Sequence, residues 1–333
     1  MKKVALFDAK PYDIEFFDEI KDKYDIEIDY FEMKIGKDSA ILAKGYDAIV
    51  AFVNDNVRSA TIERLHTYGV KAIALRCAGF NNVNLKIAKE KGIKVYRVPA
   101  YSPNAIAEHA MALLLSLNRN IHRAYNRVRE YNFSLKGFVG FDLKGKTMGV
   151  IGTGKIGKEF IKICNGFGME VIAYDPYPSE INGVQYVSLD EIFKKSDIIA
   201  LHCPLTKENH HLINENTLNL MKDGVYIINT SRGALIDSDS LLEAIKSGKV
   251  KGAGLDVYEE EADVFFEDMS DTVITDDTLK LLLGTQSVVI TSHQAFLTRE
   301  ALQAIAQITL QNLSDFFNNK KSENELIYDG FKK

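Results

Sequence analysis

The stretch that decides the fold is TMGVIGTGKIG, residues 147–157, in which an apolar run leads into three spaced glycines. The first five residues predict a buried strand, and a helical pattern follows from about Lys158. Gly152 permits a tight turn, Gly154 lets the backbone approach a ligand closely, and Gly157 lets strand and helix pack together. This order predicts a βαβ unit that binds a dinucleotide, with the pyrophosphate on N–H groups at the helix N-terminus.

An acidic residue lies at the distance from these glycines at which a dinucleotide site needs one. Asp175 follows the predicted strand Glu170–Tyr174 and stands 18 residues after Gly157. Its carboxylate can accept hydrogen bonds from the adenosine ribose hydroxyls, and it repels a 2′-phosphate. Residues 176–180 contain no lysine or arginine to neutralise such a phosphate. The alternative is a purely structural glycine turn beside an ordinary surface aspartate, but strand, helix and acid together favour an NAD site.

Apolar, β-branched runs alternate with longer helical patterns along the whole chain and fall into two groups. Strands separated by helix-length segments predict βαβ units and parallel sheets. The sequence therefore predicts the α/β class, with two doubly wound parallel-sheet domains. The first group of predicted strands is Val4–Phe7, Ile26–Phe31, Ala48–Val53, Ala72–Arg76 and Val95–Val98, and the second is Thr147–Ile151, Glu170–Tyr174, Ile198–His202, Val225–Asn229, Gly252–Asp256 and Val288–Thr291.

The break between the two groups lies at residues 98–103, VPAYSP, where two prolines make a stiff connector. A long helical pattern follows from Ala105 to about Arg129, and a last helix is predicted after Thr298. Periodicity alone does not assign this last helix to either domain.

The composition is that of a packed globular protein: 333 residues, 46% hydrophobic and 26% charged, with a net charge of −5. No stretch concentrates lysine or arginine, which argues against nucleic acid or an anionic membrane as the main partner. No secretory leader is expected, because Asp8 ends the first apolar run. The longest uncharged apolar stretch, near residues 110–117, is too short to span a bilayer.

The three cysteines, Cys77, Cys164 and Cys203, are odd in number and form no C-x-x-C pair. A cytosolic chain with reduced thiols is the simplest interpretation, and neither a disulfide framework nor a zinc ribbon is expected. Histidine spacings of the H-x-x-x-H or H-E-x-x-H kind are also missing, so the sequence predicts no metal site.

Three side-chain types at predicted strand ends suit hydride transfer to a 2-keto acid. Arg232, in NTSRG, offers a planar cation for a carboxylate, although a surface arginine is an equal alternative by position alone. His293, in TSHQAF, offers a proton for the forming alkoxide. Asp256 and Glu261 are candidates for the carboxylate that orients this histidine. Glu261 ends the acidic run 259–261, which on its own indicates a solvated face, and physical reasoning does not select it over its neighbours.

Other histidines compete with His293 for the acid–base role. His202 also ends a predicted strand, and His210 and His211 form an adjacent pair among the seven histidines of the chain.

These residues, in this order, resemble the D-2-hydroxyacid dehydrogenase family over essentially the whole chain. Within the family, the match is closest to the bacterial fermentative members, which reduce pyruvate to D-lactate. The segments that carry the resemblance are residues 52–55 (FVND), 75–83 (LRCAGFNNV), 98–103 (VPAYSP), 152–157 (GTGKIG), 201–206 (LHCPLT), 229–233 (NTSRG) and 292–296 (SHQAF).

The resemblance implies a role for each candidate residue. Arg232 matches the arginine that binds the substrate carboxylate, His293 the acid–base and Glu261 its carboxylate partner. Asp256 matches a position near the nicotinamide. The remaining substrate-binding positions are Phe52, Ala78, Gly79, Tyr101 and Phe296. The cofactor-binding positions are Gly152, Gly154, Lys155, Ile156, Gly157, Asp175, Cys203, Pro204, Asn209, Thr230, Ser231, Arg232 and Asp256.

The resemblance also implies a split architecture. A flavodoxin-like substrate domain takes residues 1–100 and 297–333, and a Rossmann-type NAD domain, residues 101–296, is inserted into it. In the family, the catalytic cleft lies between the domains and closes on binding. A cytoplasmic homodimer or homotetramer is implied, with NAD as cofactor and a small 2-keto acid such as pyruvate as substrate.

Two other functions remain open at this point. The first is reduction of bulkier 2-keto acids such as phenylpyruvate or 2-ketoisocaproate; Phe52, Tyr101 and Phe296 are expected to crowd such side chains, although single pocket methylenes change specificity only modestly. The second is a non-catalytic, NAD-sensing corepressor of the kind found among relatives of this fold. The complete set of Arg232, Glu261 and His293 favours an enzyme.

Overall fold

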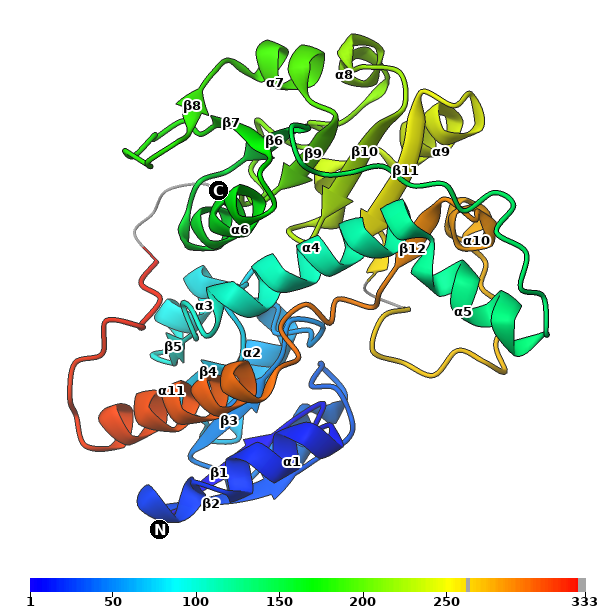
Figure 1. Cartoon of the computed structure of the whole chain (residues 1–333). Helices are drawn as coiled ribbons and strands as arrows, with labels where there is room; N and C mark the ends of the chain where they lie inside the picture. The colour runs from blue at the N-terminus through cyan, green and yellow to red at the C-terminus, as the bar shows by residue number, and fades with distance from the viewer. Residues whose placement is uncertain (262–263, 329–333) are drawn as a thin grey trace. The chain divides into compact units, whose positions relative to one another are not determined.

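The structure is a computed structural model, and it describes residues 1–261 and 264–328 (Figure 1). The contacts between Cα atoms divide the chain into two compact units, one formed by Met1–Ser102 with Leu297–Lys333 and the other by Pro103–Phe296. Each unit is built on its own parallel sheet, which confirms the predicted α/β class with two parallel-sheet domains.

The first unit contains a 5-stranded sheet in the order β2-β1-β3-β4-β5. Its strands are β1 (Lys2–Leu6), β2 (Ile26–Tyr30), β3 (Ala48–Ala51), β4 (Ala72–Leu75) and β5 (Lys94–Tyr96). Its α-helices are α1 (Pro11–Asp18), α2 (Ser59–Thr67), α3 (Leu85–Glu90) and α11 (Arg299–Phe317). The last helix, which periodicity left unassigned, contacts α1 and β4 and so packs on this sheet. The Thr298 side chain caps it by accepting a hydrogen bond from the Ala301 N–H.

The second unit contains a 7-stranded sheet in the order β12-β11-β10-β9-β6-β7-β8. Its strands are β6 (Thr147–Ile151), β7 (Glu170–Tyr174), β8 (Gln185–Tyr186), β9 (Ile198–Leu201), β10 (Val225–Asn229), β11 (Val250–Leu255) and β12 (Val288–Ile290). Its α-helices are α4 (Pro103–Arg119), α5 (Ile121–Arg129), α6 (Lys155–Gly166), α7 (Leu189–Lys195), α8 (Glu215–Leu220), α9 (Ser238–Lys246) and α10 (Asp277–Gly284).

The sheet of the second unit is covered on both faces, which explains why its central strands are apolar throughout. Along β9, Ile199 and Leu201 belong to a core beneath α7, α8, α9 and α10, whereas Ile198 and Ala200 belong to a second core beneath α4 and α6 (Figure 1). A strand that is buried on both faces needs an apolar side chain at every position. Because all strands run parallel, their carboxyl ends meet at one edge of the sheet, where open α/β folds bind ligands.

Three local expectations were wrong. The single helix expected from Ala105 to Arg129 is two helices, because Asn120 takes a left-handed conformation at φ 51° that asparagine tolerates better than most residues. Helix α6 begins at Lys155 rather than Lys158, since Gly154 already serves as its N-cap. The two-residue strand β8 was missed, because so short a strand carries no periodic pattern.

No helix among the described residues combines the length and the apolar character that a membrane span requires. The three cysteines form no disulfide: Cys77 and Cys164 are buried, and Cys203 is partly buried.

Candidate active site

The glycine-rich turn of the second unit is shaped by close backbone contacts. Gly152 has φ 96°, and a Cβ placed on it would lie 2.6 Å from the His202 carbonyl. A Cβ on Gly157 would lie 2.1 Å from the Gly152 carbonyl oxygen. Gly154, in contrast, has no atom within 4 Å of its Cβ position. The first and third glycines therefore permit the turn and the helix packing, and the second leaves exposed backbone that a ligand can approach.

The N-terminus of α6 is open toward a ligand. Gly154 is its N-cap and provides no side-chain hydrogen bond, so no cap covers the first N–H groups of the helix. Gly154 and Lys155 are exposed, Ile156 is partly buried and Gly157 is buried. Uncapped N–H groups at the positive end of a 12-residue helix suit a phosphate.

Asp175 follows β7 directly and is tied to the glycine-rich turn. One carboxylate oxygen accepts hydrogen bonds from the Thr153 N–H at 2.7 Å and from the Thr153 hydroxyl at 3.0 Å. The other accepts from the Tyr177 N–H at 2.9 Å. The predicted ribose-binding acid thus lies beside the predicted pyrophosphate turn, with its position set by backbone donors.

The segment after β9 carries three predicted cofactor residues. The Asn209 side chain fixes this loop, because its oxygen accepts from the Thr206 N–H at 2.6 Å and its amide donates to the Pro204 carbonyl at 2.8 Å. Burial raises the pKa of the Cys203 thiol to about 11, so this side chain is a neutral thiol at physiological pH. A neutral, partly buried thiol can line a cofactor site without acting as a nucleophile.

Two residues after β10 complete the predicted cofactor set. The Ser231 hydroxyl donates to the Leu201 carbonyl at 2.8 Å and so links β10 to β9. The Thr230 hydroxyl is buried, and it has no hydrogen-bond partner among the described residues. A buried hydroxyl without a partner is costly unless a ligand or water supplies one. Together with the open glycine turn, it fits a bound dinucleotide.

Arg232 lies on a turn that a buried asparagine holds. Asn229, at the end of β10, accepts from the Ser231 N–H at 3.0 Å and donates its amide to the Arg232 carbonyl at 2.9 Å. The guanidinium is partly buried and donates to the Ser231 carbonyl at 2.6 Å. The next residue, Gly233, packs against the 258–259 backbone, where a Cβ would lie 2.0 Å from the Tyr258 carbonyl carbon. The arginine turn and the acidic loop after β11 are therefore in direct contact.

The structure pairs His293 with Glu261 and with no other acid of the run 259–261. His293 Nδ1 lies 2.8 Å from Glu261 Oε1, and the two side chains are 21% and 18% exposed. The second oxygen of Glu261 accepts from the Tyr258 N–H at 2.9 Å. Glu260 is exposed, whereas Glu259 contacts a different histidine. With Nδ1 facing the carboxylate, Nε2 is the nitrogen of His293 available to a substrate.

Asp256 positions the loop that carries His293. It is fully buried, and its oxygens accept from the Thr291 hydroxyl at 2.5 Å and from the N–H groups of Gln294 and Ala295 at 2.9 Å each. His109 Nε2, from α4, lies 3.0 Å from the Thr291 hydroxyl and 3.3 Å from Asp256. Sequence reasoning assigned no role to Thr291 or His109, because Thr291 only flanks His293 in its segment, and folding alone brings His109 on α4 to this loop.

The predicted substrate residues of the first unit lie after β3 and β4. Phe52 is 5% exposed, and its ring stacks on the Arg76 guanidinium at 4.0 Å. The Ala78 carbonyl accepts from Arg97 at 3.2 Å. The N–H groups of Ala78 and Gly79, in contrast, donate to no other described residue, and both residues are partly buried. Two neighbouring open N–H groups are suited to binding a carboxylate.

The two other predicted substrate residues lie near the ends of the units. Tyr101 is partly buried, shortly before the first unit's N-terminal segment ends at Ser102. Phe296 is 7% exposed and is the last residue of the second unit.

His202 is excluded as an alternative acid–base. It is buried, its ring packs on Phe160 at 4.7 Å, and neither ring nitrogen has a hydrogen-bond partner among the described residues. Burial lowers the pKa of His202 from 6.5 to about 4, so the ring is neutral at physiological pH.

This burial predicts a loss of stability in mild acid. A histidine whose pKa is lower in the folded than in the unfolded protein makes its full contribution to the free energy of unfolding above pH ~6.5. This contribution is lost as the pH falls toward 4. Between pH 7 and pH 5 we expect a loss of about 2 kcal/mol in unfolding free energy from this residue. Urea unfolding of His202→Leu should show a smaller loss over this range than the unmutated protein. The same loss in both proteins would contradict the assignment, and His66→Leu, at an exposed histidine, serves as the control.

Known proteins match this chain along its length. A family model described as D-isomer specific 2-hydroxyacid dehydrogenase, NAD binding domain, matches residues 111–295. The D-lactate dehydrogenase of Escherichia coli (strain K12) is 51% identical over 328 residues, covering 98% of this chain and 100% of that protein.

Solved structures agree with these sequence matches. The apo-structure of the Escherichia coli D-lactate dehydrogenase superposes with a TM-score of 0.90 at 49% identity, covering 98% and 100% of the two chains. A D-2-hydroxyisocaproate dehydrogenase superposes with a TM-score of 0.87 at 36% identity, also covering 98% and 100%. These matches confirm the family resemblance and the NAD-binding character of the second unit.

Proposed function

The chain belongs to the D-isomer specific 2-hydroxyacid dehydrogenase family, and on this premise we propose that it reduces pyruvate to D-lactate with NADH in a reversible reaction. The observation that carries the proposal is the His293–Glu261 pair. This pair, Arg232 and the glycine turn all follow the carboxyl ends of strands in the same parallel sheet. The relatives named D-lactate dehydrogenase support pyruvate as the substrate.

We assign the dinucleotide to residues that line one edge of the second sheet. Gly154, Lys155 and Ile156 would hold the pyrophosphate over the N-terminus of α6, and Asp175 would accept from the adenosine ribose. The remaining lining residues would be Gly152, Gly157, Cys203, Pro204, Asn209, Thr230, Ser231, Arg232 and Asp256. When bound there, NADH supplies the hydride.

Arg232 binds the carboxylate of the substrate in this mechanism. Its planar guanidinium can donate two parallel hydrogen bonds to the two carboxylate oxygens, which fixes the orientation of the adjacent carbonyl. The family resemblance implies that the backbone N–H groups of Ala78 and Gly79 also bind the substrate carboxylate.

His293 moves the proton. Glu261 accepts the Nδ1–H of the ring, which orients the imidazole and leaves Nε2 to face the substrate. Nε2 then donates its proton to the substrate carbonyl oxygen as that oxygen becomes a hydroxyl. In lactate oxidation, the neutral Nε2 accepts the same proton. Asp256 fixes the backbone of the loop that carries His293 and so acts as a positioning residue.

A panel of 2-keto acids tests the proposal. We expect pyruvate to give the highest kcat/KM, measured by loss of NADH absorbance, and chiral chromatography to show D-lactate as the product. A higher kcat/KM for 2-ketoisocaproate or phenylpyruvate would show that the enzyme reduces bulkier 2-keto acids instead. The similarity to a D-2-hydroxyisocaproate dehydrogenase is the reason to include these substrates. NADH binding without turnover of any keto acid would support the corepressor-like alternative.

Side-chain size is a second ground, beside the similarity to D-lactate dehydrogenases, on which we favour pyruvate. Phe52, Tyr101 and Phe296 are bulky residues that would limit the group next to the carbonyl. Their effect is one of specificity alone, so a wrong assignment here would leave the reaction type unchanged.

Asp175 should determine the choice of cofactor. In Asp175→Ala, kcat/KM for NADH should fall by about tenfold or more, since a charge-assisted hydrogen bond contributes about 1.5–3 kcal/mol. The value for NADPH should fall less or rise, because repulsion of the 2′-phosphate is removed. The ratio of the two kcat/KM values measures this effect. Equal use of both cofactors by the unmutated enzyme would refute the role of Asp175.

We further propose a cytoplasmic homodimer or homotetramer, on the basis of the family resemblance. Light scattering of the purified full-length chain measures the number of subunits directly.

A further inference from the structure

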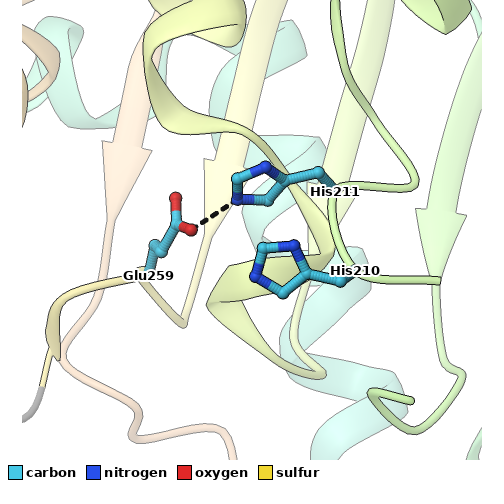
Figure 2. Close-up of side chains that lie close together, drawn as sticks. All are labelled: His210, His211 and Glu259. Atoms are coloured by element: carbon cyan, nitrogen blue, oxygen red, sulfur yellow. Dashed lines mark hydrogen bonds and ion pairs between the residues drawn. The ribbon is translucent and has the colours of Figure 1, made fainter. Parts of the chain in front are cut away.

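Three side chains of metal-ligating types, none of them in the His293–Glu261 pair, lie close together on the second unit (Figure 2). His210 and His211 come from the loop after β9, and Glu259 comes from the loop after β11. One donor atom from each lies within 4.8 Å of the other two. We propose that this trio, the 210/211/259 site, binds a divalent transition-metal ion of the zinc class. This proposal does not depend on the proposed enzymatic function.

The donor set matches the chemistry of such an ion. Two imidazole nitrogens and one carboxylate oxygen are a ligand combination that Zn²⁺ takes in proteins, with a fourth position left for water. His211 Nε2 already lies 2.5 Å from Glu259 Oε1, so these donors are preassembled across two loops. A bound ion would replace this hydrogen bond, with the His211 nitrogen unprotonated and both donor atoms directed at the metal.

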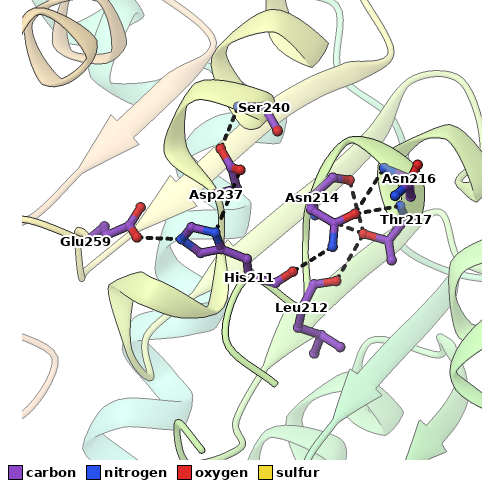
Figure 3. A network of polar contacts seen from close by, with 8 residues as sticks. All are labelled: His211, Leu212, Asn214, Asn216, Thr217, Asp237, Ser240 and Glu259. Atoms are coloured by element: carbon purple, nitrogen blue, oxygen red, sulfur yellow. Dashed lines mark hydrogen bonds and ion pairs between the residues drawn. The ribbon is translucent and has the colours of Figure 1, made fainter. Parts of the chain in front are cut away.

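A carboxylate lies near the other ring nitrogen of His211, at an ion-pair distance that is longer than a hydrogen bond. His211 Nδ1 lies 3.7 Å from Asp237 Oδ2 (Figure 3). A carboxylate facing the second ring nitrogen orients a ligating imidazole and strengthens it as a ligand. Asp237 itself is fixed, because its other oxygen accepts from the Ser240 N–H at 3.0 Å as the N-cap of α9.

The backbone of His211 is held in a sparsely populated conformation. Its φ is 51°, in the left-handed region that few side chains adopt. The His211 N–H donates to the Ala234 carbonyl at 2.9 Å, and the His211 carbonyl accepts from the Asn214 side chain at 2.7 Å (Figure 3). Such strain persists where the surroundings fix it and is common at ligand sites.

His210 supplies the third donor and the freedom to close the site. Its side chain is exposed, its ring lies 4.0 Å from that of His211, and it makes no hydrogen bond within residues 1–261 and 264–328. Rotation of this side chain can bring a nitrogen onto an ion held by the other two residues. An ion bound there would join the loop after β9 to Glu259, two residues before Glu261.

Titration of Zn²⁺ into the full-length, metal-free protein, prepared without a histidine tag, tests the proposal. We expect calorimetry to show one saturable ion per chain and Co²⁺ to give a visible absorption band typical of a site with nitrogen ligands. His210→Ala and Glu259→Gln should each weaken Zn²⁺ binding by more than the ~10–100-fold that loss of an outer partner costs. Asp237→Asn keeps the N-cap and should weaken binding by about tenfold. His66→Ala, at an exposed histidine of the first unit, should leave binding unchanged.

His210 is the decisive position, because its exposed ring makes no hydrogen bond that the fold requires. The absence of saturable Zn²⁺ binding to the unmutated protein would overturn the proposal. Binding that survives both His210→Ala and Glu259→Gln would overturn it as well. Binding lost in His293→Ala but kept in His210→Ala would assign the ion to the catalytic pair instead.

Discussion

Replacing Arg232 by lysine is expected to lower kcat/KM for pyruvate by about 100-fold, the loss that a misplacement of about 1 Å can cause at a reacting centre. Lysine keeps the positive charge but loses the planar fork that can bind both carboxylate oxygens at once. The turn itself should survive, because Asn229 holds it through the backbone of Ser231 and the Arg232 carbonyl. NADH binding, measured by fluorescence titration, should therefore change little.

Two further measurements make this prediction specific. Oxamate, an unreactive isostere of pyruvate, should lose affinity in Arg232→Lys in the presence of NADH, because it offers the same carboxylate. Arg129→Lys makes the same chemical change at an exposed position of α5, and it should alter neither kcat/KM for pyruvate nor the affinity for oxamate. If the Kd for NADH rises as steeply as kcat/KM falls, the main role of Arg232 is in the cofactor site that it lines or in the fold, and its assignment to the substrate carboxylate is wrong.

The features that the sequence predicted best are local ones. The strand Thr147–Ile151 and the three glycines after it form one continuous segment, and the spacing of the glycines predicts the tight turn at Gly152, the open backbone at Gly154 and the close packing at Gly157. The position of Asp175 was predictable for a similar reason, because the length of one βα unit fixes its distance from the glycine turn. The approximate positions of most strands were also predictable, since burial on both faces leaves an uninterrupted apolar run.

The features that sequence could not predict depend on which distant loops meet. Spacing alone gave no reason to choose Glu261 over Glu259 or Glu260; the choice follows from the packing of the loop after β11 against His293, 32 residues later. The buried Asp256, Thr291 and His109 network is of the same kind. The expected absence of a metal site likewise rested on spacing along the chain, whereas the 210/211/259 site is assembled by folding alone.

Glu261→Gln is the second substitution from which we expect a large effect. Glutamine preserves the size of the side chain and most of its hydrogen bonding, but it removes the negative charge that faces His293 Nδ1 at 2.8 Å. Without that charge, the imidazolium that must donate a proton to the substrate is less favoured, and a glutamine amide that donates to Nδ1 is incompatible with a proton on that nitrogen. Since a positioned general acid contributes about 10²–10⁴-fold, we expect kcat/KM for pyruvate to fall by about 100-fold or more.

The control variant and the affinity for NADH decide whether this loss belongs to the acid–base step. Pyruvate reduction and D-lactate oxidation must lose kcat/KM by the same factor at a given pH, because the equilibrium constant of the reaction does not change. NADH affinity should be retained, since Glu261 contacts His293 and the Tyr258 N–H. Glu260→Gln removes the same charge from the adjacent, exposed position, and it should leave kcat/KM unchanged for both pyruvate reduction and D-lactate oxidation. Comparable activities in Glu261→Gln and Glu260→Gln would show that the pair seen in the structure does not assist proton transfer, and His293 would then have to act without a carboxylate partner.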